Sequence, residues 1–327
     1  MKRREFIAGL GSAAVCPVVA RAQQGDRVRR IGVVMPFGEN DPEGKLRYSA
    51  FTQVLAGLGW TDGRNVRIDY RWSAGDPERN TKYVAELVTL APDAILATGL
   101  PILEPLMRAT RTVPIVFVQV ADPVGAGVVE SLARPGGNAT GFTNAEYSMS
   151  GKWVELLKAI APRVQRAAVL RETGPGGIAM FAAIQTVAPS SSVVVRPIGV
   201  GSLGEIERMV AAFAREPNGA LIVTPSALSI VHREPIVALA ARHRLPAIYG
   251  LRAFISAGGL ISYGADSIEP YRGAAGYIDR ILKGEKAGDL PVQAPNKFEL
   301  VINLKTAKTL GLTIPETLLA TADEVIQ

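Results

Sequence analysis

Short apolar segments alternate with longer segments of helical periodicity through most of the chain, and this alternation constrains the fold more than any other feature. Residues 28–35 are apolar and β-branched, and residues 44–58 then place apolar side chains at the spacing of a helix. The alternating pattern of 66–72 and the apolar runs at 93–97 and 115–118 predict further strands. Such an order favours right-handed βαβ units, so we expect an α/β fold with a doubly wound sheet.

The alternation breaks once and then starts again. Residues 134–138 form a turn-rich interruption with one proline and two glycines. Strand-like segments recur after it, at 167–170, 193–195, 220–223, 247–249, 260–263 and 298–302, with helical segments that include 203–214, 236–242 and 271–282. About 305 residues follow the N-terminal segment described next, which is enough for two domains. The sequence thus predicts two Rossmann-like lobes, with crossing segments near 141–144 and 291–295.

The N-terminus has the parts of an export signal. Arg3 and Arg4 begin it, residues 6–20 are apolar or small apart from one serine, and alanines flank position 21. The apolar run is too short to remain in a bilayer as a permanent span. We therefore expect residues 1–22 to be cleaved and the rest of the chain to work in the periplasm. The arginine pair resembles the twin-arginine signal, which exports folded proteins; ordinary secretion and a cytosolic chain with an apolar start are the alternatives.

Charge and cysteine content exclude several kinds of function. The net charge is +6 without a dense run of lysines and arginines, so we do not expect nucleic-acid binding. Cys16 is the only cysteine and lies in the expected signal, so the exported chain would have no disulfide, zinc thiolate or cysteine nucleophile. A lipid attached at Cys16 is disfavoured, because the bulky Val15 precedes it and Pro17 follows it.

The motifs of common enzymes are absent from the sequence. There is no Gly-x-Ser-x-Gly elbow, and Gly151-Lys152 lacks the other residues of a phosphate-binding loop. Gly125-Ala126-Gly127 lacks the third glycine of a dinucleotide-binding fingerprint. His232 and His243 are flanked by arginines and are interpreted as solvated helix residues, not as metal ligands or catalytic groups. We therefore expect neither an enzyme nor a cofactor, and a secreted α/β hydrolase is a remote alternative.

Polar or helix-starting residues follow many of the expected strands. In an open α/β sheet the carboxyl ends of the strands border the crevice where ligands bind, and N–H groups at helix starts favour an anion there. The residues expected at such a crevice are Phe37, Thr98, Gly99, Gln119 and Asp122 in the first half of the chain, and Tyr147, Thr173, Thr224, Tyr249 and Asp266 in the second. Any single Asp-Pro or Thr-Pro pair can instead be a helix cap. Their recurrence in both lobes favours a cleft between the lobes.

Several stretches, in order and nearly from end to end, match the pattern of a known family. They are Arg30-Ile31-Gly32-Val33, Leu58-Gly59-Trp60, Gly63-Arg64-Asn65-Val66, Pro114-Ile115-Val116-Phe117, Ala121-Asp122-Pro123-Val124, Pro135-Gly136-Gly137-Asn138, Ser262-Tyr263-Gly264, Pro291-Val292-Gln293 and Phe298-Glu299-Leu300-Val301-Ile302-Asn303-Leu304-Lys305-Thr306-Ala307. With these stretches the chain resembles the ABC-transporter substrate-binding proteins of the tryptophan/tyrosine-type group, which have a type 1 periplasmic-binding fold.

The resemblance implies two lobes joined by three crossing segments, with a ligand held between them. The first lobe would contain residues 28–143 and about 267–291, and the second residues 144–266 and about 296–327. The protein would be a receptor that captures an amino acid, aromatic ones included, or a related organic acid. It would act as a monomer and deliver this solute to a membrane permease with a separate ATPase. A ligand-sensing module for a membrane receptor is the alternative from another class.

The resemblance also suggests roles for some of the crevice residues. Thr98 and Gly99 would contact a ligand carboxylate at a helix start, and Asp266 would pair with the ligand ammonium group. Gln119 and Asp122 would add polar contacts. Many relatives have Gly-Thr where this chain has the reverse order, and the loop after position 171 is unusually rich in glycine. We therefore expect the contacts of the second lobe to differ from those of relatives.

Overall fold

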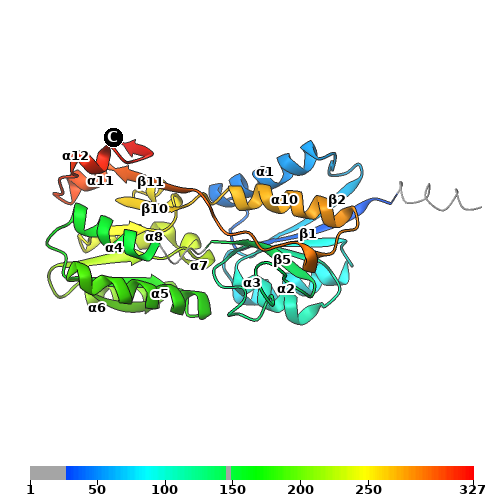
Figure 1. The fold of residues 1–327 in the computed structure, drawn as a ribbon, viewed down its shortest axis with the longest axis horizontal. Helices are drawn as coiled ribbons and strands as arrows, with labels where there is room; N and C mark the ends of the chain where they lie inside the picture. The colour runs from blue at the N-terminus through cyan, green and yellow to red at the C-terminus, as the bar shows by residue number, and fades with distance from the viewer. Residues whose placement is uncertain (1–26, 145–148) are drawn as a thin grey trace, which may run out of the picture.

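The computed structural model describes residues 27–144 and 149–327. The expected export signal, Cys16 and the expected site residue Tyr147 lie outside the described residues. The described chain forms two α/β lobes that lie side by side along the long axis of the molecule (Figure 1). This architecture confirms the fold class that the alternation of strands and helices predicted.

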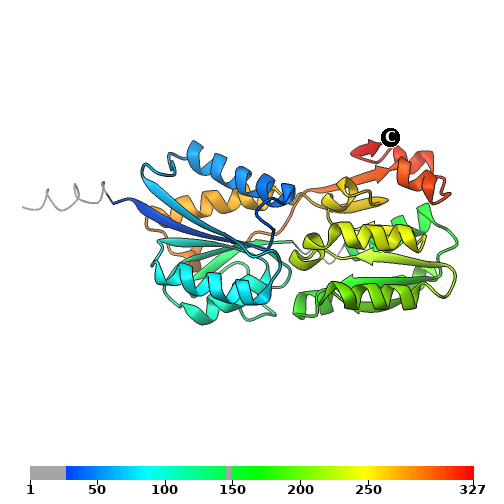
Figure 2. The same cartoon turned by 180° about the vertical axis from the view of Figure 1, so that it is seen from behind.

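The first lobe is built around a parallel sheet with the strand order β2-β1-β3-β4-β5. Its strands are β1 (Arg29–Met35), β2 (Val66–Trp72), β3 (Ala94–Thr98), β4 (Ile115–Val120) and β5 (Ala139–Thr143). Helices α1 (Pro42–Gly57) and α10 (Glu269–Leu282) lie side by side on one face of this sheet, and α2 (Pro77–Thr89) and α3 (Leu100–Ala109) cover the other (Figure 1, Figure 2). The segment after β10 therefore returns the chain to the first lobe.

Alternate side chains of β3 enter two different cores. Leu96 belongs to the core that contains Phe51 of α1, whereas Ile95 and Ala97 belong to the core that contains Leu87 of α2. Successive side chains of a strand point to opposite faces of its sheet. Because helices cover both faces, every residue of β3 is buried, which explains its continuous apolar sequence.

The second lobe contains a sheet with the order β12-β11-β10-β9-β8-β6-β7. Its strands are β6 (Arg166–Arg171), β7 (Val194–Gly199), β8 (Gly219–Val223), β9 (Ala247–Tyr249), β10 (Ile261–Ala265), β11 (Phe298–Asn303) and β12 (Glu324–Ile326). In the described chain β10 and β11 are antiparallel neighbours, and the other paired strands of this sheet are parallel. The helices are α4 (Met149–Ile160), α5 (Pro175–Val187), α6 (Leu203–Phe213), α7 (Ala227–Val231), α8 (Arg233–Arg242), α9 (Ala253–Ser256), α11 (Leu304–Thr309) and α12 (Glu316–Leu319). The 3₁₀ turns in the described residues are η2 (Ala188–Ser191) in this lobe and η3 (Ala287–Asp289), which follows α10.

The last crossing segment runs beside β5 before it enters the second lobe. The N–H of Thr143 donates to the oxygen of Gln293 at 2.9 Å, and the N–H of Gln293 donates to the oxygen of Gly141 at 2.9 Å. The chain then passes to β11, as the orange segment of Figure 1 shows. Within residues 27–144 and 149–327, no helix combines the length and apolar character needed to cross a membrane.

Strand β5 is not predicted by the sequence, because a glycine and two threonines interrupt its apolar pattern. The glycine is required by the packing of the sheet. A Cβ atom at Gly141 would lie 2.0 Å from the backbone oxygen of Phe117 in β4, which is far inside van der Waals contact. The close approach of β4 and β5 thus requires glycine at position 141, although glycine generally weakens a strand.

Candidate functional site

The two lobes touch at the carboxyl ends of their strands, and glycines make the contact. A Cβ atom at Gly99, which starts α3, would lie 2.6 Å from the Cβ of Ala227 at the start of α7. A Cβ atom at Gly176, in the first turn of α5, would lie 2.6 Å from the Cβ of Ala121 after β4. Neither position accepts a side chain while the lobes are this close, so the structure is a closed arrangement of the two lobes.

One ion pair joins the lobes across the same interface. The guanidinium of Arg233 donates to both carboxylate oxygens of Asp41, at 2.9 and 3.0 Å. The two side chains are only 9% and 15% exposed. Asp41 also caps α1, since its Oδ1 accepts the N–H of Glu43 at 2.9 Å. A bidentate pair that is largely removed from water contributes to the closed form, because opening the lobes separates it.

Residues of both lobes enclose a small cavity at this interface. Its volume is about 10 Å³, which is about the room of one water molecule. We call its lining the interlobe site, and it consists of Ala121, Asn144, Glu172, Gly176, Gly177, Met180, Thr224 and Pro225. The ends of β4, β5, β6 and β8 and the start of α5 thus converge on one point, as expected for a crevice at the strand ends of two open sheets.

Several buried oxygen atoms at these strand ends have no hydrogen-bond partner in the described part of the chain. They include Oε1 of Glu172 and Oδ1 of Asn144 in the interlobe site, and Oε1 of Gln119 two residues before Ala121. Buried polar atoms are rarely left unpaired, because each lost hydrogen bond costs about 1–3 kcal/mol. The site is therefore built to be completed by another molecule.

The backbone of Gln119 supports the same interpretation. Its φ of +58° lies in the left-handed region, and the pairing of β4 with β5 shifts register between Val118 and Val120. A non-glycine residue in this conformation is strained, and such strain concentrates at functional sites. The irregularity lets Gln119 depart from the regular side-chain alternation of β4 at the end that faces the second lobe.

Burial raises the pKa of the Glu172 carboxyl from 4.5 to about 7, and a hydrogen bond from the Ala227 backbone partly counteracts this shift. The residue as a whole is partly exposed, but its Oε1 is enclosed. Part of the Glu172 population is therefore protonated near neutral pH. The closed form is favoured at low pH and becomes less stable as the pH rises from about 4.5 through 7, because a charge must then be buried.

We predict that Glu172→Gln shifts the ligand-free protein toward the closed form at pH 8, by up to about 3 kcal/mol, because the amide mimics the protonated acid and no charge is buried on closure. At pH 4 the native carboxyl is itself protonated, so the two proteins should be closed to the same extent. Small-angle scattering at both pH values measures the difference in radius of gyration. An equal difference at both values would show that burial of the Glu172 charge does not limit closure.

The sequence-predicted residues of the first lobe lie where expected, at strand ends. Thr98 ends β3, is fully buried, and its hydroxyl lies 3.1 Å from the hydroxyl of Tyr271 in α10. Gly99 follows it with a φ of +81° and begins α3 without a side-chain cap. Phe37 is also fully buried, and the guanidinium of Arg47 lies 4.9 Å from its ring centre. The ring of Phe37 is thus part of the packing beneath the strand ends.

The two predicted aspartates both accept hydrogen bonds from nearby backbone. Oδ1 of Asp122 accepts the N–H of Gly125 at 2.7 Å, within a turn and not at the start of a helix. Oδ1 of Asp266 accepts the N–H of Ile268 at 2.7 Å and that of Glu269 at 3.3 Å, just before α10. Local backbone contacts therefore occupy one carboxylate oxygen of each residue.

The predicted residues of the second lobe separate into different environments. Thr224 lines the interlobe site, and its hydroxyl donates to the oxygen of Leu170 at 3.0 Å. Thr173 is exposed. Tyr249 ends β9 instead of lying in a loop, is 1% exposed, and stacks on Phe254 with ring centres 4.7 Å apart. Its ring belongs to the core of the second lobe.

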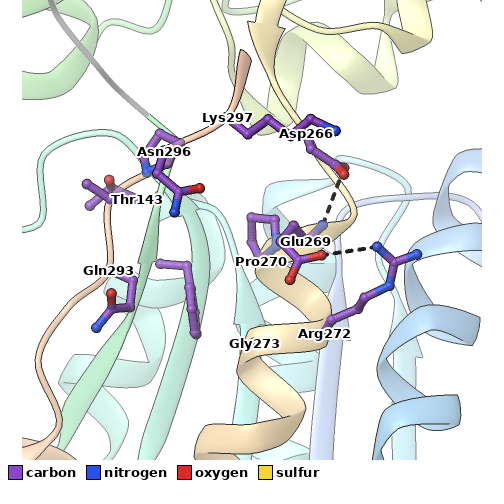
Figure 3. Close-up of a pocket in the computed structure, with 12 residues that line it drawn as sticks. Thr143, Asp266, Glu269, Pro270, Arg272, Gly273, Gln293, Asn296 and Lys297 are labelled. Atoms are coloured by element: carbon purple, nitrogen blue, oxygen red, sulfur yellow. Dashed lines mark hydrogen bonds and ion pairs between the residues drawn. The ribbon is translucent and has the colours of Figure 1, made fainter. Parts of the chain in front are cut away.

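Asp266 lines a second, larger cavity at the hinge (Figure 3). This hinge cavity has a volume of about 490 Å³ and is lined by Phe142, Thr143, Asp266, Glu269, Pro270, Arg272, Gly273, Gln293, Ala294, Pro295, Asn296 and Lys297. Its acidic and basic side chains are partly paired, since Arg272 donates to Glu269 at 3.1 Å. The structure therefore places Asp266 and Glu172 in different cavities. No group of three potential metal ligands occurs among the described residues.

Comparison with known proteins gives one family and several relatives. Residues 33–326 match the family model of ABC transporter substrate binding proteins. A tyrosine-binding protein of Clostridioides difficile strain R20291 is 27% identical over 264 residues, which cover 80% of this chain and 75% of that protein.

Solved structures have the same architecture. The crystal structure of an ABC domain in complex with L-Trp from Streptococcus pneumoniae has a TM-score of 0.84 and 28% identity, and the match covers 91% of this chain and 99% of that one. The ligand-free, open structure of a substrate-binding protein with adhesive properties from Clostridium difficile has a TM-score of 0.65 and 23% identity. This match covers 92% of this chain and 100% of that one.

Proposed function

Because the chain belongs to the ABC transporter substrate-binding protein family and is a solute-binding receptor, we propose that its solute is an amino acid held between the two lobes. The observation that carries this proposal is a group of buried oxygen atoms at the interface that have no partner among the described residues: Oε1 of Gln119 in the first lobe, and Oδ1 of Asn144 and Oε1 of Glu172 in the interlobe site. A relative binds tyrosine by name, and a similar structure holds L-Trp. Both make a zwitterion the first ligand class to consider.

The charges suited to a zwitterion lie on opposite lobes. The start of α3 at Gly99 has no side-chain cap and lies against the second lobe at Ala227, so the positive end of this ten-residue helix favours a carboxylate at the interface. Acceptor oxygens of the second lobe suit the ammonium group. A solute that contacts both lobes favours the closed form over the open one. Capture is therefore a change of conformation and involves no covalent step. Asp266 as the ammonium partner stays a prediction.

We further propose that the receptor delivers its solute as a monomer to the permease of an ABC transporter, whose ATPase is a separate chain. Family membership supports the permease as partner. The basic start and the apolar run of residues 1–22 support export to the periplasm with cleavage near residue 22. The arginine pair supports the twin-arginine route, and replacing both arginines with lysine tests this route.

A screen of melting temperatures tests the ligand class. We expect one or a few of the twenty amino acids to raise the melting temperature, because a solute that binds only the folded protein adds about 2.7 kcal/mol of stability at 100 times its Kd. Calorimetric titration then confirms the stoichiometry. A panel of sugars and polyols serves as the comparison. Stabilisation by a sugar, with no response to any amino acid, would contradict the proposed ligand class.

A further inference from the structure

We propose that Glu172 selects solutes with a protonated nitrogen, which deepens the proposed function and rests on a ligand bound between the lobes. Glu172 directly follows β6, and α5 begins three residues later. A Cβ atom at Gly177 would lie 2.0 Å from the backbone oxygen of Glu172, so glycine is needed to bring α5 this close. The packing of α5 thus fixes the carboxyl-bearing loop against the opposite lobe.

The Glu172 carboxyl has one enclosed oxygen and no paired cation. Among the described residues its Oε1, in the interlobe site, has no hydrogen-bond partner, and the neighbouring Arg171 guanidinium donates to the backbone oxygen of Glu172 at 2.8 Å instead. Within residues 27–144 and 149–327, no lysine, arginine or histidine nitrogen lies within 4.0 Å of this carboxyl. A buried carboxylate is strongly disfavoured unless a cation pairs with it. The missing cation is supplied most simply by the solute.

Two other side chains of the interlobe site offer acceptor oxygens. Asn144 presents its Oδ1, which has no partner among the described residues. The hydroxyl of Thr224 donates its hydrogen to the oxygen of Leu170, so only its lone pairs remain for a solute. Together with Oε1 of Glu172, these atoms place three acceptors around the same cavity, beside Gly176 and Gly177 in the first turn of α5. An ammonium group has three N–H donors and no acceptor, so these three oxygen atoms suit it.

The size of the cavity agrees with this assignment. The room beside Glu172 is about 10 Å³, which suits one water molecule or one ammonium group. A methyl group there would leave these oxygen atoms unpaired. A single trapped water is the competing occupant, and the experiment below separates the two.

The test compares molecules that differ only in the ammonium group. Native protein and Glu172→Gln are titrated with L-tryptophan, L-tyrosine and the other amino acids, and with the acids that lack the amino group, such as indole-3-propionate. Amines without a carboxylate, such as tryptamine and tyramine, complete the panel. Loss of the acid partner of a buried charge weakens binding by about 30-fold or more, so Glu172→Gln should weaken the amine-bearing solute by this factor. Affinity for the acid that lacks the amine should remain weak in both proteins.

Glu155→Gln is the matched control, because Glu155 is exposed, pairs with Lys152 within α4 of the second lobe, and lines neither the interlobe site nor the hinge cavity. Circular dichroism checks that each variant is folded. If native protein and Glu172→Gln bind an amino acid with equal affinity, the inference is overturned. The same holds if native protein binds an amino acid and its deaminated acid equally well. Both results leave the proposed function intact. Binding of an amine but of no amino acid would support Glu172 and contradict the proposed ligand. Binding of neutral sugars alone would overturn both.

Discussion

A Gly176→Leu variant should fold as the native protein does but bind its solute on the order of 100-fold more weakly, because the competent closed state becomes a minor population. Gly176 lies in the first turn of α5, and the atoms that a Cβ would meet belong to the opposite lobe: Cβ of Ala121 at 2.6 Å and N of Asp122 at 3.1 Å. The added side chain therefore clashes only when the lobes close. Calorimetric titration measures the loss of affinity, and small-angle scattering should show a larger radius of gyration in the presence of solute.

The control for this prediction is Gly204→Leu. Gly204 is also near the start of a helix of the second lobe, α6, but no atom lies within 4 Å of a Cβ placed there. It should bind solute like the native protein. If Gly176→Leu binds as tightly as this control, the close approach of α5 to the first lobe is not part of the ligand-bound state.

Arg233→Ala should lower solute affinity by about 30-fold or more, because removal of one partner of a buried ion pair costs about 3–5 kcal/mol. Without Arg233 the carboxylate of Asp41 would be enclosed without a countercharge each time the lobes close. The open form keeps that carboxylate in water, so the variant should shift toward it. Scattering of the ligand-free protein and calorimetric titration measure the shift and the affinity.

Arg280→Ala provides the comparison for that measurement. Arg280 pairs with Glu285 within the first lobe, and both side chains are about half exposed, at 46% and 48%. Exposed pairs contribute about 0–1 kcal/mol, so affinity should be unchanged. Native affinity in both variants would mean that the pair between Arg233 and Asp41 does not hold the lobes together.

The sequence predicted the fold well because the pattern of buried parallel strands is local. The apolar runs at 93–97 and 115–118 correspond to β3 and β4, whose neighbours on both faces are helices. The strand ends were equally predictable, and Thr98 and Thr224 lie at them. Strand β5 was missed because its Gly141 is required by the close contact with Phe117 of β4. A local sequence pattern does not reveal a contact between residues far apart in the chain.

The site was harder to predict, because it depends on what each strand end meets across the interface. Glu172 lies at the end of a largely apolar strand, as Thr98 does, but its enclosure arises only where the second lobe meets the first. Tyr249 was expected to flank a ligand, yet the sequence could not show that Phe254 lies against its ring. From the sequence, Asp122 and Asp266 could each be a ligand-binding group or a local cap. In the structure, each accepts a hydrogen bond from nearby backbone.

The glycines between the lobes have a consequence for release. Where Gly99 meets Ala227 and Gly176 meets Ala121, the surfaces that come together consist of backbone and single methyl groups. Hydrophobic stabilisation grows with the apolar area removed from water, at about 25 cal/mol per Å², so these contacts contribute little to holding an empty receptor shut. The bound solute and the ion pair between Arg233 and Asp41 must therefore supply most of the stability of the closed form. Once that ion pair is broken, opening of the lobes meets little further resistance.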